Sequence, residues 1–329
     1  MSDIMKSDTK IGFIGMGSMG FPICYGLQAS GYQMIIPYYR KDEDCRSGYS
    51  ELIPDRDKKA AAMDVMVEKG AVAASDQKEL IALADVIVIS MPTSRQVEGL
   101  VLSSDGILNN AKPGTVVIDL TTADPSSTRS LAKQLEGKGI ELLDAPISGG
   151  TRGAAAQTLS VMVGGNEQVY TEMLPVLNTI GNPEKVFYMG PSGAGNTIKV
   201  VNNCLSATHI AADTEALLIA AKAGIDPVKA LAVINVSGGR SIVTEERLPN
   251  IVLPGKKFNF AMAMMRKDIA LFSQITRDQK ISAPVTNMAN QIWHIPTQAG
   301  DDSNEDIANL IKMYQNWIGA EIYGVIKED

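Results

Sequence analysis

The chain reads, from residue 10 to residue 20, Lys10-Ile11-Gly12-Phe13-Ile14-Gly15-Met16-Gly17-Ser18-Met19-Gly20. The apolar residues before Gly15 predict a short strand, and residues 19–30 have the pattern of a helix that Gly31 ends. Residues 33–36 predict a second strand. A strand, a glycine-rich turn, a helix and a second strand in this order form the first half of a doubly wound α/β domain.

The three glycines of this turn have the spacing of a dinucleotide-binding site. Gly15 permits a tight turn, Gly17 lets the backbone approach a pyrophosphate, and Gly20 lets the helix pack closely on the strand. The N–H groups and the dipole at the start of the helix favour the phosphates. The alternative is a glycine-rich turn without a ligand. The flanking strand and helix favour binding, and the expected cofactor contacts are Gly15, Met16, Gly17, Ser18, Met19 and Gly20.

The rest of the chain divides into two parts by its pattern. Strands are predicted over residues 86–90, 115–119, 141–144 and 160–163, with helical patterns between them, which indicates a mostly parallel sheet covered on both faces. After about Gly190 only helical patterns follow, over residues 195–223, 261–278, 285–299 and 307–318. The predicted fold is a Rossmann domain of residues 1–190, then an all-helical domain of residues 191–329, joined by a long helix.

Composition limits the class of partner. A length of 329 residues favours two domains, and a net charge of -7 argues against nucleic acid or anionic membrane. The longest apolar run, residues 84–92, is too short to span a bilayer. Three scattered cysteines and two histidines lack the spacing of metal ligands, so we expect no metal site and a cytoplasmic protein.

The end of the second predicted strand bears on the choice of nicotinamide cofactor. NAD enzymes usually carry an acid here for the ribose 2′-hydroxyl, but the chain reads Pro37-Tyr38-Tyr39-Arg40-Lys41. Arg40 could bind the 2′-phosphate of NADP, so we favour NADP and keep NAD possible. The alternative is a solvated loop, because three acids follow at residues 42–44. Residues 41–59 form a long polar insertion.

Other strand ends carry candidate cofactor and substrate contacts. Met91, Pro92 and Thr122 follow two strands, at the edge where ligands bind in such sheets, although they could simply begin turns. Ser148, Gly149 and Gly150 follow a further strand, and their hydroxyl and N–H groups suit a substrate carboxylate. Asp144, at the start of that segment, is expected to stabilise a turn rather than act as an acid.

Lys199 and Asn203 are four residues apart and therefore share a helix face. Most helix lysines are solvated, but the apolar neighbours Val200, Val201 and Leu205 predict a buried helix. A desolvated lysine has a lowered pKa and can exchange a proton with a hydroxyl or carbonyl oxygen near neutral pH. Asn203 could position the same oxygen or a carboxylate.

Three more side chains are candidates in the helical part. Phe260 and Lys267 are seven residues apart and could pack near and hydrogen-bond the cofactor. Arg240, in the loop of residues 237–241, could bind a second anionic group of the substrate, or pair with an acid at a domain contact.

With these residues assembled, the chain resembles the β-hydroxyacid dehydrogenases, which include 3-hydroxyisobutyrate, tartronate-semialdehyde and 2-(hydroxymethyl)glutarate dehydrogenases. Residues 12–20, residues 144–150 and the Lys199/Asn203 segment carry the resemblance, which extends from Ile11 to about Gly319. It implies that Lys199 is the general acid/base. It also implies that Ser148, Gly149 and Asn203 hold the substrate carboxylate, that Thr122, Phe260 and Lys267 border the cofactor, and that the protein forms dimers or tetramers.

The expected function is hydride transfer between NADP or NAD and a small β-hydroxy acid or the matching semialdehyde. One alternative is an imine reductase, a class that shares this fold but usually lacks the lysine. Another is a non-catalytic NADP-binding module, which has no need of a proton-transfer group such as Lys199.

Overall fold

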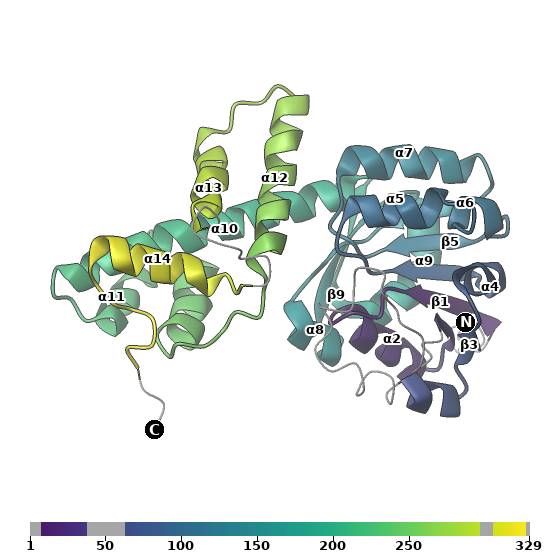
Figure 1. Ribbon diagram of the computed structural model, residues 1–329, viewed down its shortest axis with the longest axis horizontal. Coiled ribbons are helices and arrows are strands. Elements are labelled where there is room, and N and C mark those ends of the chain that lie inside the picture. The colour runs from purple at the N-terminus through teal and green to yellow at the C-terminus, as the bar shows by residue number, and fades with distance from the viewer. Residues whose placement is uncertain (1–7, 38–62, 297–304, 327–329) are drawn as a thin grey trace. The chain divides into compact units, whose positions relative to one another are not determined.

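The computed structural model describes residues 8–37, 63–296 and 305–326 (Figure 1). The chain divides into two compact units between Lys199 and Val200, inside the long helix α10 (Ala194–Lys222). The two units are taken in turn.

The first unit begins as the glycine pattern predicts, with β1 (Lys10–Ile14), α2 (Gly20–Ala29) and β2 (Gln33–Pro37). Alternating strands and helices follow: β3 (Val72–Ala74), α4 (Gln77–Leu83), β4 (Val86–Ile89), α5 (Ser94–Leu102), α6 (Ile107–Asn110), β5 (Val116–Asp119), α7 (Pro125–Glu136) and β6 (Glu141–Asp144). The unit is completed by β7 (Ile147–Ser148), α8 (Gly150–Ala156), β8 (Leu159–Gly164), α9 (Glu167–Ile180) and β9 (Gly181–Gly190).

The sheet has the strand order of a doubly wound domain. Its order is β3-β2-β1-β4-β5-β6-β8-β7, and β9 pairs with β8. The six strands from β3 to β6 are all parallel, whereas β8 runs antiparallel to β6 and β7. The chain reverses its direction of winding between β1 and β4, where Ile14 pairs with Ile89. Ligands bind at the carboxyl ends of the strands at such a point, and the predicted fold class is confirmed.

Both faces of the sheet are covered because strand residues alternate between two cores. Ile11 and Phe13 of β1 pack with α2, α8 and α9, whereas Ile87 and Ile89 of β4 pack with α4, α5, α6 and α7. In Figure 1, α5, α6 and α7 lie on one side of the strands and α2 and α8 on the other. All four of these isoleucine and phenylalanine side chains are fully buried. Along β4, Val86 and Val88 belong to the first core and Ile87 and Ile89 to the second, so the even and odd positions of one strand serve different layers.

The second unit is helical in its described residues. It contains the rest of α10, then α11 (Pro227–Ile234), a π-helical segment η1 (Val243–Val252), α12 (Met262–Asp278), α13 (Pro284–His294) and α14 (Ala308–Ile318). The Asp226 carboxylate accepts the amides of Val228 and Lys229, and Pro227 occupies the first helical position, so α11 begins as its sequence dictates. Trp293, fully buried, donates its indole N–H to the carbonyl of Ala207 and joins α13 to α10.

One expected helix was too long, and three strands of the first unit, β3, β7 and β9, were not predicted. The helix predicted over residues 285–299 ends at His294, because Pro296 has no N–H to donate to the preceding turn. The strand β9 was not predicted, since its residues alternate only weakly in polarity and include Pro183. It pairs in parallel with β8, from Leu159 to Gly164.

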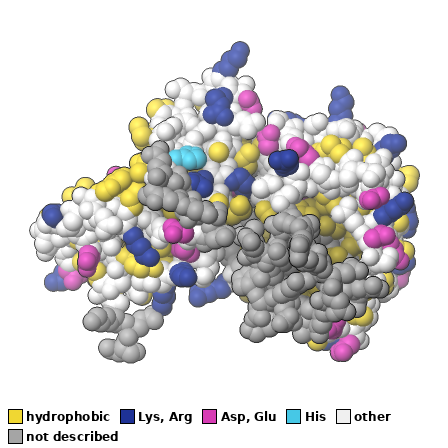
Figure 2. Space-filling view, in the orientation of Figure 1, with side chains coloured by type: hydrophobic (Ala, Val, Ile, Leu, Met, Phe, Trp, Pro, Cys, Tyr) yellow, Lys and Arg dark blue, Asp and Glu magenta, His cyan; other side chains and the backbone are white. Residues whose placement is uncertain are grey.

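The surface bears on the expected partners. In the part of the chain that the structure describes, no helix combines the length and apolarity needed to cross a membrane. On the face drawn in Figure 2, the described Lys and Arg side chains lie among Asp and Glu side chains.

Candidate active site

The turn after β1 has the geometry that its three glycines predict. Gly15 has a φ of +100°, and a Cβ there would collide with the carbonyl oxygen of Ser90. A Cβ at Gly20 would collide with the carbonyl oxygen of Gly15. A Cβ at Gly17, in contrast, would meet no atom of the described residues within 4 Å. Protein packing therefore requires glycine at the first and third positions, whereas the open space at Gly17 suits a close ligand.

The start of α2 is also open to an anion. Its N-cap residue, Met19, makes no side-chain capping bond, and the backbone carbonyl of Gly17 accepts the amide of Phe21 at 2.9 Å. Helix N-termini carry unpaired N–H groups and a positive dipole end, both of which favour a phosphate. The residues present thus fit the pyrophosphate of a dinucleotide.

The strand ends beside this turn are joined by side chains. Met91 donates its amide to the hydroxyl of Thr121 at 3.1 Å, and Thr121 donates its amide to the Asp119 carboxylate at 2.9 Å. These bonds hold the segments after β4 and β5 together. The predicted cofactor contacts Met91, Pro92 and Thr122 lie on these segments, and all three are half-buried.

The predicted carboxylate-binding turn lies between β7 and α8. Ser148 ends β7 and pairs with Ser160 of β8. Gly149 and Gly150 have φ angles of +134° and +64°, which other residues rarely adopt, and both are exposed. The positive φ values turn the chain directly into α8 and keep the backbone of this segment accessible.

Asp144, the last residue of β6, is fully buried beneath that segment. Its carboxylate accepts the amide of Gly193 at 2.7 Å and the amide of Asn196 at 2.8 Å. Burial raises the pKa of Asp144 to about 6, although the hydrogen bonds from Gly193 and Asn196 act in the opposite direction. Asp144 therefore joins the sheet to the first turn of α10, which fits the expected structural role.

Asn196 was not singled out by sequence reasoning, and it makes a second connection to α10. Its side-chain oxygen accepts the amide of Ala123 at 2.8 Å, and its side-chain nitrogen donates to Thr128 Oγ1 at 3.2 Å. Asn196 is fully buried. Lys199 follows one turn later on the same helix with only 7% of its surface exposed.

In the second unit, Asn203 and Lys267 meet at a third side chain, Asp268. Asn203 donates its side-chain amide to Asp268 Oδ2 at 2.6 Å, and Lys267 Nζ lies 3.0 Å from Asp268 Oδ1. Asp268 is 3% exposed. The buried carboxylate thereby fixes the orientation of both candidates. Sequence reasoning gave a role to Lys267 and none to Asp268.

The remaining candidates are less closely connected to these groups. Phe260 is half-buried and packs against the core of the second unit. Arg40, the predicted contact for a 2′-phosphate, and the insertion of residues 41–59 lie outside the described residues. Within the described ranges, no group of three or more His, Cys, Asp or Glu side chains could hold a metal ion.

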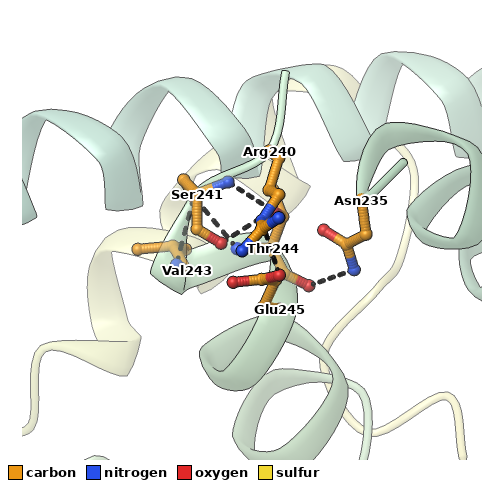
Figure 3. Close-up of polar contacts among 6 residues, drawn as sticks. All are labelled: Asn235, Arg240, Ser241, Val243, Thr244 and Glu245. Carbon is orange, nitrogen blue, oxygen red and sulfur yellow. Dashed lines mark hydrogen bonds and ion pairs between the residues drawn. The ribbon is translucent and has the colours of Figure 1, made fainter. Parts of the chain in front are cut away.

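Arg240 pairs with Glu245, an acid of its own unit five residues away, and not with an acid at a domain contact (Figure 3). Its Nε lies 2.7 Å from Glu245 Oε1, and its side chain is 63% exposed. The Ser241 hydroxyl accepts the amides of Val243 and Thr244, both at 3.1 Å, at the start of η1. Arg240 is thus part of a surface turn whose geometry is set by local bonds.

Known proteins match the chain over nearly its whole length. A family model described as the NAD binding domain of 6-phosphogluconate dehydrogenase matches residues 10–190. A second, described as NAD-binding of NADP-dependent 3-hydroxyisobutyrate dehydrogenase, matches residues 193–314. The 2-(hydroxymethyl)glutarate dehydrogenase of Eubacterium barkeri is 33% identical over 97% of this chain and 99% of its own length.

Solved structures separate the dehydrogenase interpretation from the imine reductase alternative. The 3-hydroxyisobutyrate dehydrogenase of Mycobacterium tuberculosis, solved with L-serine, is 29% identical with a TM-score of 0.77, over 93% of this chain and 98% of that one. An imine reductase from Myxococcus stipitatus is 16% identical with a TM-score of 0.59, over 93% and 99%, and shares the fold alone. The matches over both units, the open glycine turn and the fold place this chain in the β-hydroxyacid dehydrogenase family of nicotinamide-dependent oxidoreductases.

Proposed function

We propose that the protein interconverts a small β-hydroxy acid and its semialdehyde, with NADP favoured over NAD and Lys199 as general acid/base. The observation that carries this proposal is the burial of Lys199, at 7% exposure, one turn after the anchored start of α10. A lysine on a surface helix is normally solvated, whereas one in a desolvated site can exchange a proton near neutral pH.

The remaining residues have binding roles in this proposal. The residues of the glycine turn hold the pyrophosphate, and Met91, Pro92, Thr122, Phe260 and Lys267 border the nicotinamide half of the cofactor. Ser148, Gly149, Gly150 and Asn203 hold the substrate carboxylate. A bound nicotinamide cofactor would supply the hydride acceptor for oxidation and the hydride donor for reduction. Lys199 Nζ takes the hydroxyl proton during oxidation and returns it to the carbonyl oxygen during reduction.

The substrate class follows from what the relatives act on. The Eubacterium barkeri and Mycobacterium tuberculosis enzymes are both named after acids with a hydroxyl on the β carbon. The L-serine bound to the second enzyme is also such an acid. A panel of 2-(hydroxymethyl)glutarate, 3-hydroxyisobutyrate and L-serine, assayed with NADP and with NAD, tests the proposal. Turnover of one of them supports it. Reduction of cyclic imines without turnover of any hydroxy acid would favour the imine reductase. Cofactor binding without turnover of any substrate would favour the non-catalytic module.

The preference for NADP rests on the residues that follow β2. The positions after Pro37 offer Arg40 and no acid before Asp42, and an arginine can bind a 2′-phosphate through paired hydrogen bonds. We expect tighter binding of NADPH than of NADH, and we expect Arg40→Ala to weaken NADPH binding about 10-fold while leaving NADH binding unchanged. Titration by protein fluorescence measures both, with Lys41→Ala as the matched control. Equal losses for both cofactors would contradict the phosphate contact.

Two finer proposals concern the assembly and the compartment. Helix α10 presents an exposed stripe without charged residues, at a helical spacing, that includes Leu205, Ala212, Ala216 and Ile219. Such a stripe suits burial against a second copy, so we propose a homodimer or homotetramer. Sedimentation of the wild-type protein tests this, and a monomer would contradict it.

The free, buried thiols of Cys24 and Cys204 suit the reducing cytoplasm.

A further inference from the structure

We infer that Asp144 is a positioning residue for Lys199, which it holds by fixing the first turn of α10 to the carboxyl end of β6. This inference rests on the catalytic role proposed above for Lys199. It assigns to Asp144 a part in turnover that goes beyond the stabilisation of a turn.

The geometry of the carboxylate carries the inference. Each of its two oxygens accepts one backbone amide of the α10 start, Oδ1 from Gly193 and Oδ2 from Asn196. Lys199 lies one turn further along this helix, so a shift or rotation of the first turn moves its ammonium group by a similar amount. Asp144 itself is fixed in the sheet, because it pairs with Asp119 of β5 and with Gly164 of β8.

Glycines make the room that brings the carboxylate into contact with the helix backbone. A Cβ at Gly164 would lie 2.7 Å from Asp144 Oδ1, and a Cβ at Gly195 would lie 3.0 Å from Oδ2. Both distances are shorter than ordinary van der Waals contacts. The approach of α10 to Asp144 is therefore close on both sides and leaves the helix start little freedom.

The same residue also begins the segment that leads to Ser148. The amide of Ala145 donates to the carbonyl of Asp119 at 2.7 Å, and the carbonyl of Pro146 accepts the amide of Met162 at 3.1 Å. These bonds hold the three residues between Asp144 and Ser148 against the sheet. Asp144 thus connects two parts of the proposed site: the turn at Ser148, which is proposed to bind the substrate carboxylate, and the helix that carries Lys199.

Stability alone does not account for an ionised group at this place. Burial raises the pKa of Asp144 despite its hydrogen bonds, so the fold favours the neutral form more than water does. At neutral pH the chain carries a charge that costs stability. A group kept at such a cost is expected where geometry serves function.

The variant Asp144→Asn tests the inference, because it keeps the size of the side chain. Its amide nitrogen would face one of the two N–H donors, so one bond to α10 is replaced by a repulsive contact. We expect kcat to fall about 10- to 100-fold, since small displacements of a catalytic group have effects of this size. The dissociation constants for NADPH and NADH should change less than about two-fold, because they depend on the turn after β1.

Asp226→Asn is the matched control. Asp226 also accepts two amides at a helix start, that of α11, and it has no role in the proposed site. We expect it to keep kcat within about two-fold. Hydrogen exchange of the peptide that spans residues 190–200 should speed up in Asp144→Asn and remain unchanged in Asp226→Asn. A wild-type kcat in Asp144→Asn, or an unchanged exchange rate in this peptide, would overturn the inference.

A second variant decides the matter if Asp144→Asn does not fold. Asn196→Ala removes the bonds to Ala123 and Thr128 but keeps the amide that Asp144 accepts. A lower kcat with unchanged cofactor affinity would support the inference that the first turn of α10 positions Lys199. A wild-type kcat despite faster exchange in residues 190–200 would overturn it. The exchange measurement is independent of turnover. If the wild-type protein oxidises no hydroxy acid, the proposed function fails while the exchange arm still reports whether Asp144 holds the helix.

Discussion

Each of the two units contains a buried aspartate, and the carboxylates of these two residues, Asp144 and Asp268, bind different kinds of group. Asp144 in the first unit meets backbone amides, whereas Asp268 in the second unit meets the side chains of Asn203 and Lys267. Backbone amides belong to rigid elements, so Asp144 fixes the position of a helix. Side chains turn about their own bonds, so Asp268 fixes the orientation of two groups on elements already in place. Asp144 therefore fixes the position of a helix, and Asp268 fixes the orientation of two side chains.

The largest expected effect that separates the two aspartates is the pH dependence of stability. The pKa of Asp144 is raised to about 6 in the folded protein, from 3.8, so its stabilising contribution is present below pH 4 and is lost as the pH rises through 6. We expect the free energy of unfolding of the wild type, relative to Asp144→Asn, to fall by at most about 3 kcal/mol between pH 4 and pH 7.

Urea unfolding at several pH values measures this difference. Asp144→Asn lacks the titrating carboxyl group, so its free energy of unfolding at each pH is the reference for the wild type. A difference between wild type and variant that grows toward neutral pH would have the wrong sign, and it would show that the bonds to α10 outweigh the cost of burial.

A smaller effect is expected at Asp268, and it should appear in binding and turnover. Asp268→Asn keeps one acceptor for Asn203 but removes the charge opposite Lys267. If Asn203 and Lys267 contact substrate and cofactor, kcat/KM for the hydroxy acid should fall about 10-fold, because both groups lose their fixed orientation. Steady-state kinetics measure this. Asp278→Asn, at the exposed end of the same helix α12, is the control, and an equal loss there would show a general effect on the helix.

The comparison also explains how much could be predicted from the sequence. The turn of Gly15, Gly17 and Gly20 was predictable because strand, turn and helix are local patterns. The close approach of Ser90 to Gly15 was not part of that pattern. The long helix that carries Lys199 was predictable for the same reason, since its pattern continues without a break until Gly224.

Contacts between distant residues were not predictable. The bond from Ala123 to Asn196 joins residues 73 apart in the sequence, and the bond from Asn203 to Asp268 joins residues 65 apart. The periodicity of apolar residues along a helix or strand does not indicate such distant pairs. The one available signal was that Asp144 and Asp268 are charged residues beside apolar ones, which favours a buried carboxylate with a partner but does not identify it.

The role of Lys199 is the central claim, and the variant Lys199→Met tests it most directly. Methionine has a similar length and no proton to transfer. Lys222→Met is the control, because Lys222 lies at the exposed end of the same helix and donates to the carbonyl of Gly319. We predict that kcat for the best substrate of the panel falls about 100- to 10,000-fold in Lys199→Met, with NADPH affinity and the Lys222→Met rate unchanged. A Lys199→Met enzyme that turns over at the wild-type rate would contradict the account.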